Sequence, residues 1–265
     1  MMPITGHTRI FGILADPIHH VKTPEVMNAL LCRHGVDGVL VPFHVAPDGL
    51  AALVAGLRAQ QNFGGFIATV PHKPAMLALC DALEPEAARV GAVNCVRREA
   101  DGRMIGAMLD GIGFVEGLRA AGHDPRGMRA YVAGAGGAAS AVAFALAGAG
   151  VAALTIANRT EYKARALCNR IAASYPALPL STDATDVAGQ DLVMNATSLG
   201  MREGDALPLD AGALHPGQIV AEAIMQPAMT PLLLAAQTAG CRIQPGLPML
   251  ECQISLMARH MGAIR

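Results

Sequence analysis

The chain has 265 residues, and its 20 lysines and arginines against 21 aspartates and glutamates give a formal net charge of −1. This balance argues against a nucleic-acid-binding protein, which usually carries a basic patch, and the 52% of hydrophobic residues argue against a disordered chain. The length allows one large domain or two smaller ones, each with its own core.

The cysteines and the apolar segments point to a cytoplasmic protein without a metal. Six cysteines form no C-x-x-C pair and no zinc-finger spacing, so reduced thiols are expected. The N-terminus lacks the basic segment and long apolar stretch of a signal peptide. The uncharged segment 130–158 is long enough for a membrane span, but its glycines divide it into pieces that fit two buried strands and a helix of small residues better.

The first hundred residues alternate short apolar runs with helical patterns. The runs predict strands at 10–14, 39–45 and 65–70, and the helical patterns cover 24–34, 47–59 and 73–81. Thr23 is expected to cap the first helix, which Pro24 begins and Gly35 ends. Strands separated by helices of this length indicate parallel pairing, with helices packed on the faces of the sheet.

The second part of the chain repeats this alternation after a boundary. A helix is expected over 110–121, followed by the polar, turn-rich stretch 122–127. The strands expected next lie at 130–133, 153–157, 192–195 and 218–221, and a methionine-rich helix closes the chain at 249–264.

A glycine-rich motif follows the strand at 131–133. The segment Gly134-Ala135-Gly136-Gly137-Ala138-Ala139 matches G-x-G-x-x-A, in which glycines let the backbone turn tightly and approach a pyrophosphate at a helix N-terminus. The alternative is a glycine-rich turn that serves tight helix packing. The preceding strand, the helix of small residues and the second strand favour dinucleotide binding.

The end of the second strand of this region should contact the ribose of the adenosine. An acidic residue there would favour NAD, but the chain has Asn158-Arg159-Thr160, with Lys163 three residues on. A guanidinium can bind a 2′-phosphate with two hydrogen bonds, so NADP is predicted. Glu161 keeps NAD as an alternative, and a solvated helix start with ordinary basic residues is the other interpretation.

Two residues of the first part are candidates for proton transfer. Lys73 ends the segment Thr69-Val-Pro-His-Lys73, and Asp110 begins the helix at 110–121. A lysine beside a carboxylate can relay a proton to a forming alkoxide. Taken alone, each has a simpler interpretation, Lys73 as a solvated surface residue and Asp110 as a helix N-cap.

Together, these segments resemble the shikimate dehydrogenases, a family that includes quinate and related dehydrogenases. The resemblance covers nearly the full chain. Its motifs are, in order, Pro17-Ile18, Pro24 with Asn28, Thr69-Val-Pro-His-Lys73, Gly91-Ala-Val-Asn94, Asp110-Gly-Ile-Gly-Phe114, Gly134-Ala-Gly-Gly137, Asn158-Arg-Thr160, Asn195-Ala-Thr-Ser-Leu-Gly-Met201, Pro227 with Thr230, and Gly246 with Met249-Leu250 and Gln253.

The resemblance implies an α/β fold of two α/β domains. An N-terminal substrate-binding domain with a mainly parallel sheet would span 1–109 and be completed by the C-terminal helix 247–265, and a Rossmann-type NAD(P)-binding domain would span 110–246. It also implies reversible, nicotinamide-dependent oxidation of a ring alcohol, as in the biosynthesis of chorismate and the aromatic amino acids.

The resemblance also assigns roles to individual residues. Lys73 and Asp110 would be the catalytic pair. The residues that would bind the substrate are Thr23, Thr69, Asn94 and Gln253. The residues that would bind NADP are Gly134, Ala135, Gly136, Gly137, Ala138, Asn158, Arg159, Thr160, Lys163, Thr197, Ser198 and Gly246, of which the segment 195–201 would lie along the nicotinamide.

The chain departs from the family at the substrate. Val21 and Thr23 stand where the family usually has two serines that hold the substrate carboxylate. Asn and Thr before the catalytic Asp are Met108 and Leu109, a pocket Asn is Ile67, and a Tyr near Pro227 is Met225; His19 and His20 flank the changed serine. The losses predict a substrate other than shikimate, or weak activity with shikimate.

Three functions follow from these observations. The first is an NADP-dependent oxidoreductase acting on a shikimate-type cyclic hydroxy acid or a polyol. The second keeps the fold with quinate or another cyclic polyol as substrate and NAD as cofactor. The third is a non-catalytic nucleotide-binding regulator, which the retention of Lys73 and Asp110 argues against. In each case we expect a small-molecule partner, no nucleic acid, no membrane, and a monomer or homodimer.

Overall fold

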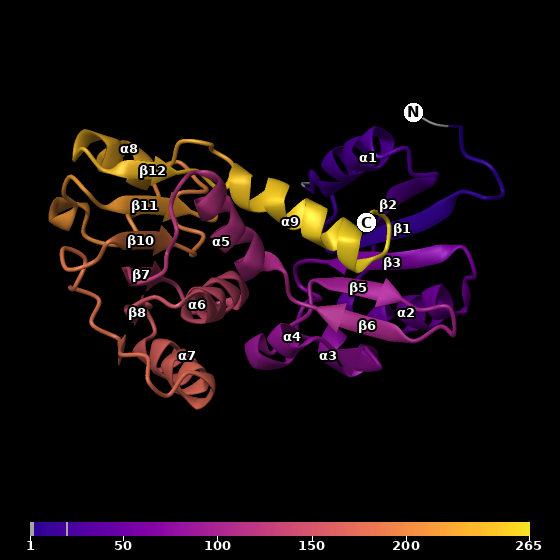
Figure 1. Ribbon diagram of the computed structural model, residues 1–265, viewed down its shortest axis with the longest axis horizontal. Coiled ribbons are helices and arrows are strands. Elements are labelled where there is room, and N and C mark those ends of the chain that lie inside the picture. Colours follow the sequence, from indigo (N-terminus) through magenta and orange to yellow (C-terminus); the bar gives the residue numbers. More distant parts are fainter. Residues whose placement is uncertain (1–2, 20) are drawn as a thin grey trace. The chain divides into compact units, whose positions relative to one another are not determined.

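The computed structural model describes residues 3–19 and 21–265, so His20 lies outside the described residues. The chain forms two compact units. Unit 1 runs to Leu109 and resumes over Gln253–Arg265, and unit 2 is Asp110–Cys252. Each unit has its own sheet, and the helices and strands are labelled in Figure 1.

The sheet of unit 1 is mixed. Its strands, within the described residues, are β1 (Arg9–Ala15), β2 (Gly38–His44), β3 (Phe63–Ala68), β4 (Ala82–Leu83), β5 (Cys95–Arg98) and β6 (Met104–Ala107). They lie in the order β2-β1-β3-β5-β6-β4. The three strands expected from the sequence pair in parallel, as do β4 and β6, whereas β5 runs antiparallel to both β3 and β6. The sequence did not indicate this hairpin.

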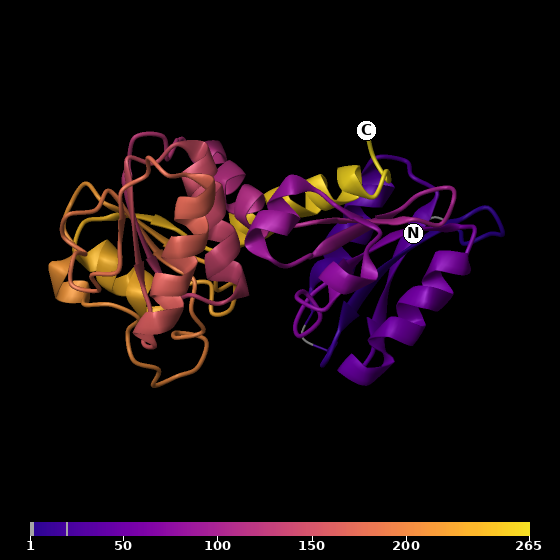
Figure 2. The same cartoon turned by 90° about the horizontal axis from the view of Figure 1, so that it is seen from below.

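The helices of unit 1 are α1 (Thr23–Arg33), α2 (Leu50–Ala59), α3 (Met76–Leu79), α4 (Pro85–Val90) and the last part of α9 (Leu247–His260). Helix α1 and α9 cover one face of the sheet and α2 covers the other (Figure 2). The sulfur of Cys95 in β5 donates to the Met257 carbonyl of α9 at 3.8 Å. Arg9 of β1 donates to the Gly262 carbonyl at 2.8 Å, so the C-terminus is fixed to this sheet.

Two local predictions in unit 1 are wrong. Thr23 is the first residue of α1 and not its N-cap; Lys22 holds that position without a side-chain cap hydrogen bond. The reason is that Lys22 already has helical backbone angles (φ −90°, ψ −10°), whereas a capping side chain needs an extended backbone. The helix expected over 73–81 is reduced to the single turn α3, because 70–75 form turns that end at the N-terminus of that helix.

The sheet of unit 2 is parallel throughout its described strands. These are β7 (Arg129–Ala133), β8 (Ala153–Ala157), β9 (Leu180–Ser181), β10 (Leu192–Asn195), β11 (Ile219–Glu222) and β12 (Arg242–Gln244). Their spatial order is β9-β8-β7-β10-β11-β12. This is the Rossmann order 3-2-1-4-5-6, in which the direction of winding reverses between β7 and β10.

Helices cover both faces of this sheet. They are α5 (Asp110–Ala120), α6 (Gly137–Ala149), α7 (Glu161–Ser174) and α8 (Pro231–Thr238). Residues of α8, including Leu232 and Leu233, pack with Tyr131, Val193 and Val220 of the central strands. Helices α5 and α6 pack closely, because a Cβ at Gly111 would overlap the Ala141 carbonyl.

The uncharged segment 130–158 forms β7, α6 and β8, as expected. Helix α6 has 13 residues, and all but two of those that follow its first two are buried. Within the described part of the chain, no helix combines the length and hydrophobicity needed to cross a bilayer.

Candidate active site

The glycine-rich motif forms the turn between β7 and α6. Gly134 has a φ of +118°, and a Cβ there would lie 2.9 Å from the Ala196 carbonyl oxygen, so only glycine fits. Gly136 is the N-cap of α6, and built Cβ atoms at Gly136 and Gly137 meet no atom within 4 Å. No side chain caps α6, so the amides of its first turn face open space, as an anion-binding helix N-terminus requires.

The segment after β8 presents basic side chains. The amide of Asn158 donates to the Thr160 carbonyl at 3.0 Å and so fixes the turn into α7. Arg159 and Lys163 are exposed on either side of this turn. Glu161, which kept NAD as an alternative, forms an ion pair with Arg165 one turn along the helix at 2.5 Å. This arrangement can present positive charge to a 2′-phosphate.

The segment after β10 is held by side-chain hydrogen bonds. The Asn195 Oδ1 accepts from the Thr197 backbone amide at 3.0 Å and from the Thr197 hydroxyl at 2.8 Å. Its amide nitrogen donates to the Leu199 carbonyl at 3.0 Å, and the Leu199 amide donates to the Thr197 hydroxyl. Ser198 lies exposed on this turn. The segment thus has a defined backbone shape next to the glycine-rich turn.

Other residues that follow strands of this sheet lie at the same edge. Gly246 follows β12, and a Cβ there would overlap the Ile224 carbonyl. Met201 and Met225 follow β10 and β11 and are 58% and 45% exposed, which is high for methionine. The structure therefore gathers the expected cofactor residues along the carboxyl edge of the unit 2 sheet, where ligands bind in this fold.

In unit 1, the segment 69–73 turns at the carboxyl end of β3. Its backbone is held by the Thr69 amide, which donates to the Leu14 carbonyl at 3.0 Å, and by the His72 amide, which donates to the Thr69 carbonyl at 2.7 Å. The buried His72 ring contacts the Val45 carbonyl at 2.9 Å through Nε2. Val45 follows β2, so this contact fixes His72, the residue immediately before Lys73.

Asn94 lies beside this turn. The Val93 amide donates to the Lys73 carbonyl at 2.9 Å, so Lys73 and Asn94 are on adjoining segments. Asn94 is 1% exposed, and its Oδ1 accepts from the Leu109 amide at 2.9 Å. Asp110 comes next, is 5% exposed and begins α5. Thr69, Lys73 and Asn94 are thus brought together within unit 1.

The other expected substrate residues lie on helices. Thr23 and Val21 are half-buried at the start of α1. Gln253 is 7% exposed on α9, four residues before Met257, whose carbonyl contacts Cys95. Residues four apart share a helix face, so Gln253 lies on the same face of α9 as Met257. The roles of Thr23 and Gln253 at the substrate stay predictions.

The sequence analysis missed two polar residues at this edge. His44, at the end of β2, contacts Asp16 Oδ1 through Nε2 at 2.9 Å, and Asp16 follows β1. The His19 ring lies edge-on to His44 with centroids 5.4 Å apart. Only the rule that polar residues following parallel strands share one edge could have indicated this cluster.

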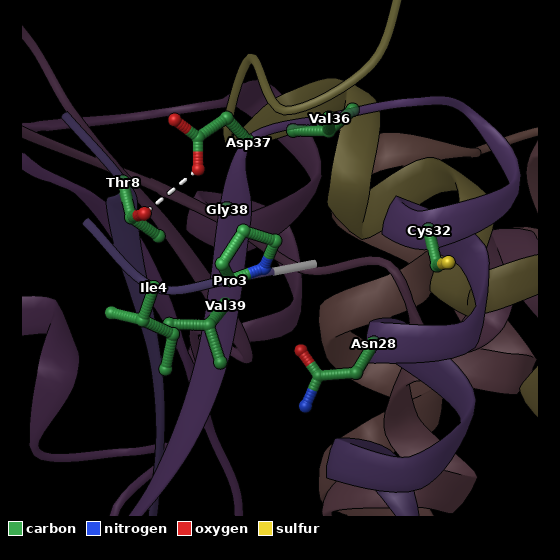
Figure 3. A pocket seen from close by; sticks show the side chains of 9 residues that line it. All are labelled: Pro3, Ile4, Thr8, Asn28, Cys32, Val36, Asp37, Gly38 and Val39. Atoms are coloured by element: carbon green, nitrogen blue, oxygen red, sulfur yellow. Dashed lines mark hydrogen bonds between the residues drawn. The ribbon is translucent and has the colours of Figure 1, made fainter. Parts of the chain in front are cut away.

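Unit 1 has a small pocket away from this edge. Neither that pocket nor a group of acidic residues forms a second candidate site. The pocket, of about 50 Å³, is lined by Ile4, by Asn28 and Cys32 of α1 and by Gly38, and Figure 3 shows these residues. It lies at the amino end of β2, opposite the edge that carries Lys73. Over residues 3–19 and 21–265, no three His, Cys, Asp or Glu residues cluster as metal ligands would.

The fold and the edge of unit 2 define a dinucleotide-binding oxidoreductase. Family models match both parts of the chain: the shikimate dehydrogenase substrate binding domain over residues 13–96, and shikimate / quinate 5-dehydrogenase over residues 119–201. The shikimate dehydrogenase (NADP(+)) of Rubrobacter xylanophilus is 44% identical over 255 residues, which are 94% of this chain and 89% of that protein. The chain belongs to the shikimate dehydrogenase family.

Solved structures agree with this assignment. A shikimate dehydrogenase in complex with NADP+ is 31% identical, with a TM-score of 0.93, and covers 99% of this chain and 93% of its own. The ligand-free 5-ketofructose reductase of Gluconobacter sp. strain CHM43 is 33% identical, with a TM-score of 0.88, over 95% and 92% of the two chains. This chain is thus similar to solved structures that are named for different substrates.

Proposed function

We propose that the protein is an NADP-dependent oxidoreductase that interconverts the ketone and the alcohol of a shikimate-type cyclic hydroxy acid. The observation that carries this proposal is the 44% identity, over 94% of the chain, to a protein named shikimate dehydrogenase (NADP(+)). The two α/β units agree with it, unit 1 as the substrate-binding and unit 2 as the cofactor-binding part.

The carboxyl edge of the unit 2 sheet fits NADP. The open backbone at Gly136 and Gly137 leaves room for a pyrophosphate at the N-terminus of α6. Arg159 and Lys163 are exposed where the 2′-phosphate of the adenosine would lie, with Asn158 and Thr160 beside them. When bound, the nicotinamide supplies the hydride.

Thr197, Ser198 and Gly246 would lie along the nicotinamide half of the cofactor. Their segments follow β10 and β12, on the other side of β7 from the adenosine-binding strand β8. Ala135 and Ala138 would complete the turn around the pyrophosphate. The close packing of Gly246 against Ile224 supports a site whose backbone allows no extra side-chain atom there.

In unit 1, Lys73 would transfer the proton. In the direction of reduction, its ammonium group donates a proton to the forming alkoxide, and in the direction of oxidation the neutral amine accepts it. Asp110 would pair with Lys73 and hold its charge. Thr69, Asn94 and Gln253 would hydrogen-bond the hydroxyl groups of the substrate and orient the reacting carbon.

The end of the site that would hold a carboxylate is changed. Val21 has no polar side-chain atom, and Thr23 keeps one hydroxyl that the helix does not use as a cap. Ile67 and Met108, at 3% and 1% exposed, are packed into the core and offer no polar side-chain atom either. These residues would bind a carboxylate weakly, because a desolvated charge without donors is costly.

A second candidate follows from this change. The site would accept a polyhydroxy ketone without a carboxylate, and the likeness to a protein named 5-ketofructose reductase supports this class of substrate. We further propose that the protein acts in the cytoplasm as a monomer or homodimer. The cysteines of the structure are free thiols, as a reducing compartment favours.

Steady-state turnover tests the proposed function. The purified protein would be assayed with NADPH and NADH against 3-dehydroshikimate, and with NADP+ and NAD+ against shikimate, quinate and a panel of uncharged cyclic alcohols, following the absorbance of the reduced nicotinamide. We expect turnover with NADPH exceeding that with NADH. Binding of NADPH without turnover of any of these compounds would instead indicate a regulator.

A further inference from the structure

Glu222 is a buried carboxylate at the carboxyl end of β11 to which the proposed function gives no role. Its side chain is 0% exposed, and burial raises its pKa above the usual range. The Asn195 amide nitrogen donates to Oε1 at 3.1 Å and to Oε2 at 3.0 Å. The Thr230 hydroxyl donates to Oε1 at 2.7 Å. No ion pair of the described residues involves Glu222, so hydrogen bonds alone stabilise it.

Both side-chain donors hold segments at the cofactor edge. Thr230 is the N-cap of α8, and its hydroxyl accepts from the Leu233 amide at 3.2 Å while it donates to Glu222. Asn195 holds the turn that contains Thr197 and Leu199. One carboxylate therefore joins the segment after β10 to the segment after β11.

The polarity of these groups leaves the Asn195 amide one orientation. A backbone amide can only donate, so the Thr197 amide requires the oxygen of Asn195 on its side. A carbonyl can only accept, so the Leu199 carbonyl requires the nitrogen. The nitrogen then faces Glu222, whose two carboxylate oxygens accept from it. A donor at this place would oppose the nitrogen and favour a flipped amide that breaks the turn.

The turn lies on the nicotinamide side of the proposed cofactor site. Strands β10 and β11 are fourth and fifth in the Rossmann order, beyond β7 from the strand that contacts the adenosine. The Ala196 carbonyl, within the turn, is the atom that a Cβ at Gly134 would meet at 2.9 Å. A change in this turn therefore reaches the nicotinamide half of the edge, and the basic residues after β8 are two strands away.

We propose that Glu222 is a positioning residue that orients the Asn195 amide and so holds the segment 195–200 in the shape that binds the nicotinamide half of NADP(H). This inference rests on the proposed function, because it takes unit 2 to bind NADP(H).

The test compares two ligands on the Glu222→Gln variant. NADPH occupies the whole edge, whereas 2′-phospho-ADP-ribose keeps the adenosine, the 2′-phosphate and the pyrophosphate but lacks the nicotinamide. Glu222→Gln should weaken NADPH about 10- to 100-fold, the worth of one hydrogen bond to a charged group, and 2′-phospho-ADP-ribose less than about twofold.

Gln218 provides the matched control. It is a buried amide just before β11, at the opposite edge, and donates to the Val187 and Gln190 carbonyls at 2.9 and 2.8 Å. Gln218→Glu should lower the melting temperature without changing the ratio of the two affinities. If Glu222→Gln does not fold, Glu222→Asp is measured in its place. Its side chain is one methylene shorter, so it should also weaken NADPH more than 2′-phospho-ADP-ribose.

Three results would overturn the inference. Unchanged NADPH affinity in the Glu222 variant would remove its role, and equal weakening of both ligands would show a merely structural one. A wild-type protein that binds neither ligand would overturn the proposed function, and this inference with it.

Discussion

The carboxyl edges of the two sheets differ in whether backbone or side chains form the proposed binding site. In unit 2, backbone defines the turn at Gly134 and the segment at Gly246: Gly134 has a left-handed φ that brings it against the Ala196 carbonyl, Gly246 lies against the Ile224 carbonyl, and no side chain caps α6. In unit 1, the corresponding edge depends on side chains, and Lys73 projects from a turn whose backbone is held by the residues around it.

The difference explains why one site keeps the family pattern while the other departs from it. A substitution at Gly134 or Gly246 collides with backbone, so the dinucleotide edge can change little without loss of the fold. Val21 in place of a serine would change what the proposed site can recognise, because no strand or helix bond of the backbone involves a side chain there. The same fold can therefore keep its cofactor and change its substrate.

Lys73→Ala separates the chemistry of unit 1 from the cofactor edge of unit 2, and it should have the largest effect. Turnover should fall on the order of 100-fold or more, as expected on losing a general acid–base, while the affinity for NADPH is retained. Steady-state kinetics and fluorescence titration with NADPH measure the two. Arg103→Ala, which removes an exposed cation paired with Asp101, is the control. Near-normal turnover of Lys73→Ala would remove Lys73 from the mechanism.

Arg159→Ala probes the cofactor edge alone. It should weaken NADPH by about 10- to 100-fold and NADH little, because only NADPH has a phosphate for the guanidinium to bind. Arg170→Gln, on the same helix α7 but with its guanidinium over the Phe144 ring, should leave both affinities unchanged. Equal losses for both cofactors, or a wild type that prefers NADH, would show that Arg159 is solvated and that other residues discriminate between NADPH and NADH.

Val21→Ser sharpens the account of the changed substrate edge. Restoring a hydroxyl should lower the Michaelis constant for shikimate by a factor of roughly 5 to 50, the worth of one charge-assisted hydrogen bond. Val36→Ser, a matched substitution at the pocket of Figure 3, controls for a general effect of the change. A wild-type Michaelis constant in the tens of micromolar, with no gain from Val21→Ser, would show that His19 or His20 supplies the donor.

His44→Gln should have the smallest effect. The His44–Asp16 pair is exposed, with 47% and 34% of the two side chains accessible, and such pairs contribute about 0–1 kcal/mol. The Michaelis constant for shikimate should therefore change by less than about fivefold. A larger rise, with turnover unchanged, would show that the ring contact between His19 and His44 orients a histidine towards the substrate.

The parallel strands of unit 2 could be predicted from the sequence. The strands expected at 153–157 and 192–195 have the bounds of β8 and β10, because strands buried on both faces are continuous apolar runs between glycines and polar turns. In unit 1, the sequence pattern did not predict β5, because Arg97 and Arg98 make this segment polar. Arg98 is nonetheless 9% exposed, since its guanidinium donates to the Arg58 and Glu99 carbonyls.

The site was predictable where a local motif carries it and not where distant segments meet. The turn 134–138 and Lys73 belong to contiguous motifs and could be named from the sequence. Glu222 could not, because its role depends on contacts with Asn195 and Thr230 from two other segments. That Lys22 and not Thr23 is the N-cap of α1 could not be predicted from the sequence either, since it depends on the backbone angles of Lys22.

The central claim is that the site keeps its chemistry and no longer recognises a carboxylate strongly. The most direct test compares kcat/KM for shikimate with that for its primary amide, which is uncharged and of nearly the same size, using the wild-type protein and NADP+. The account predicts that the two values differ by less than about fivefold, because Val21 provides no charge-assisted hydrogen bond to lose. A loss of about 100-fold or more on neutralising the carboxylate would contradict it.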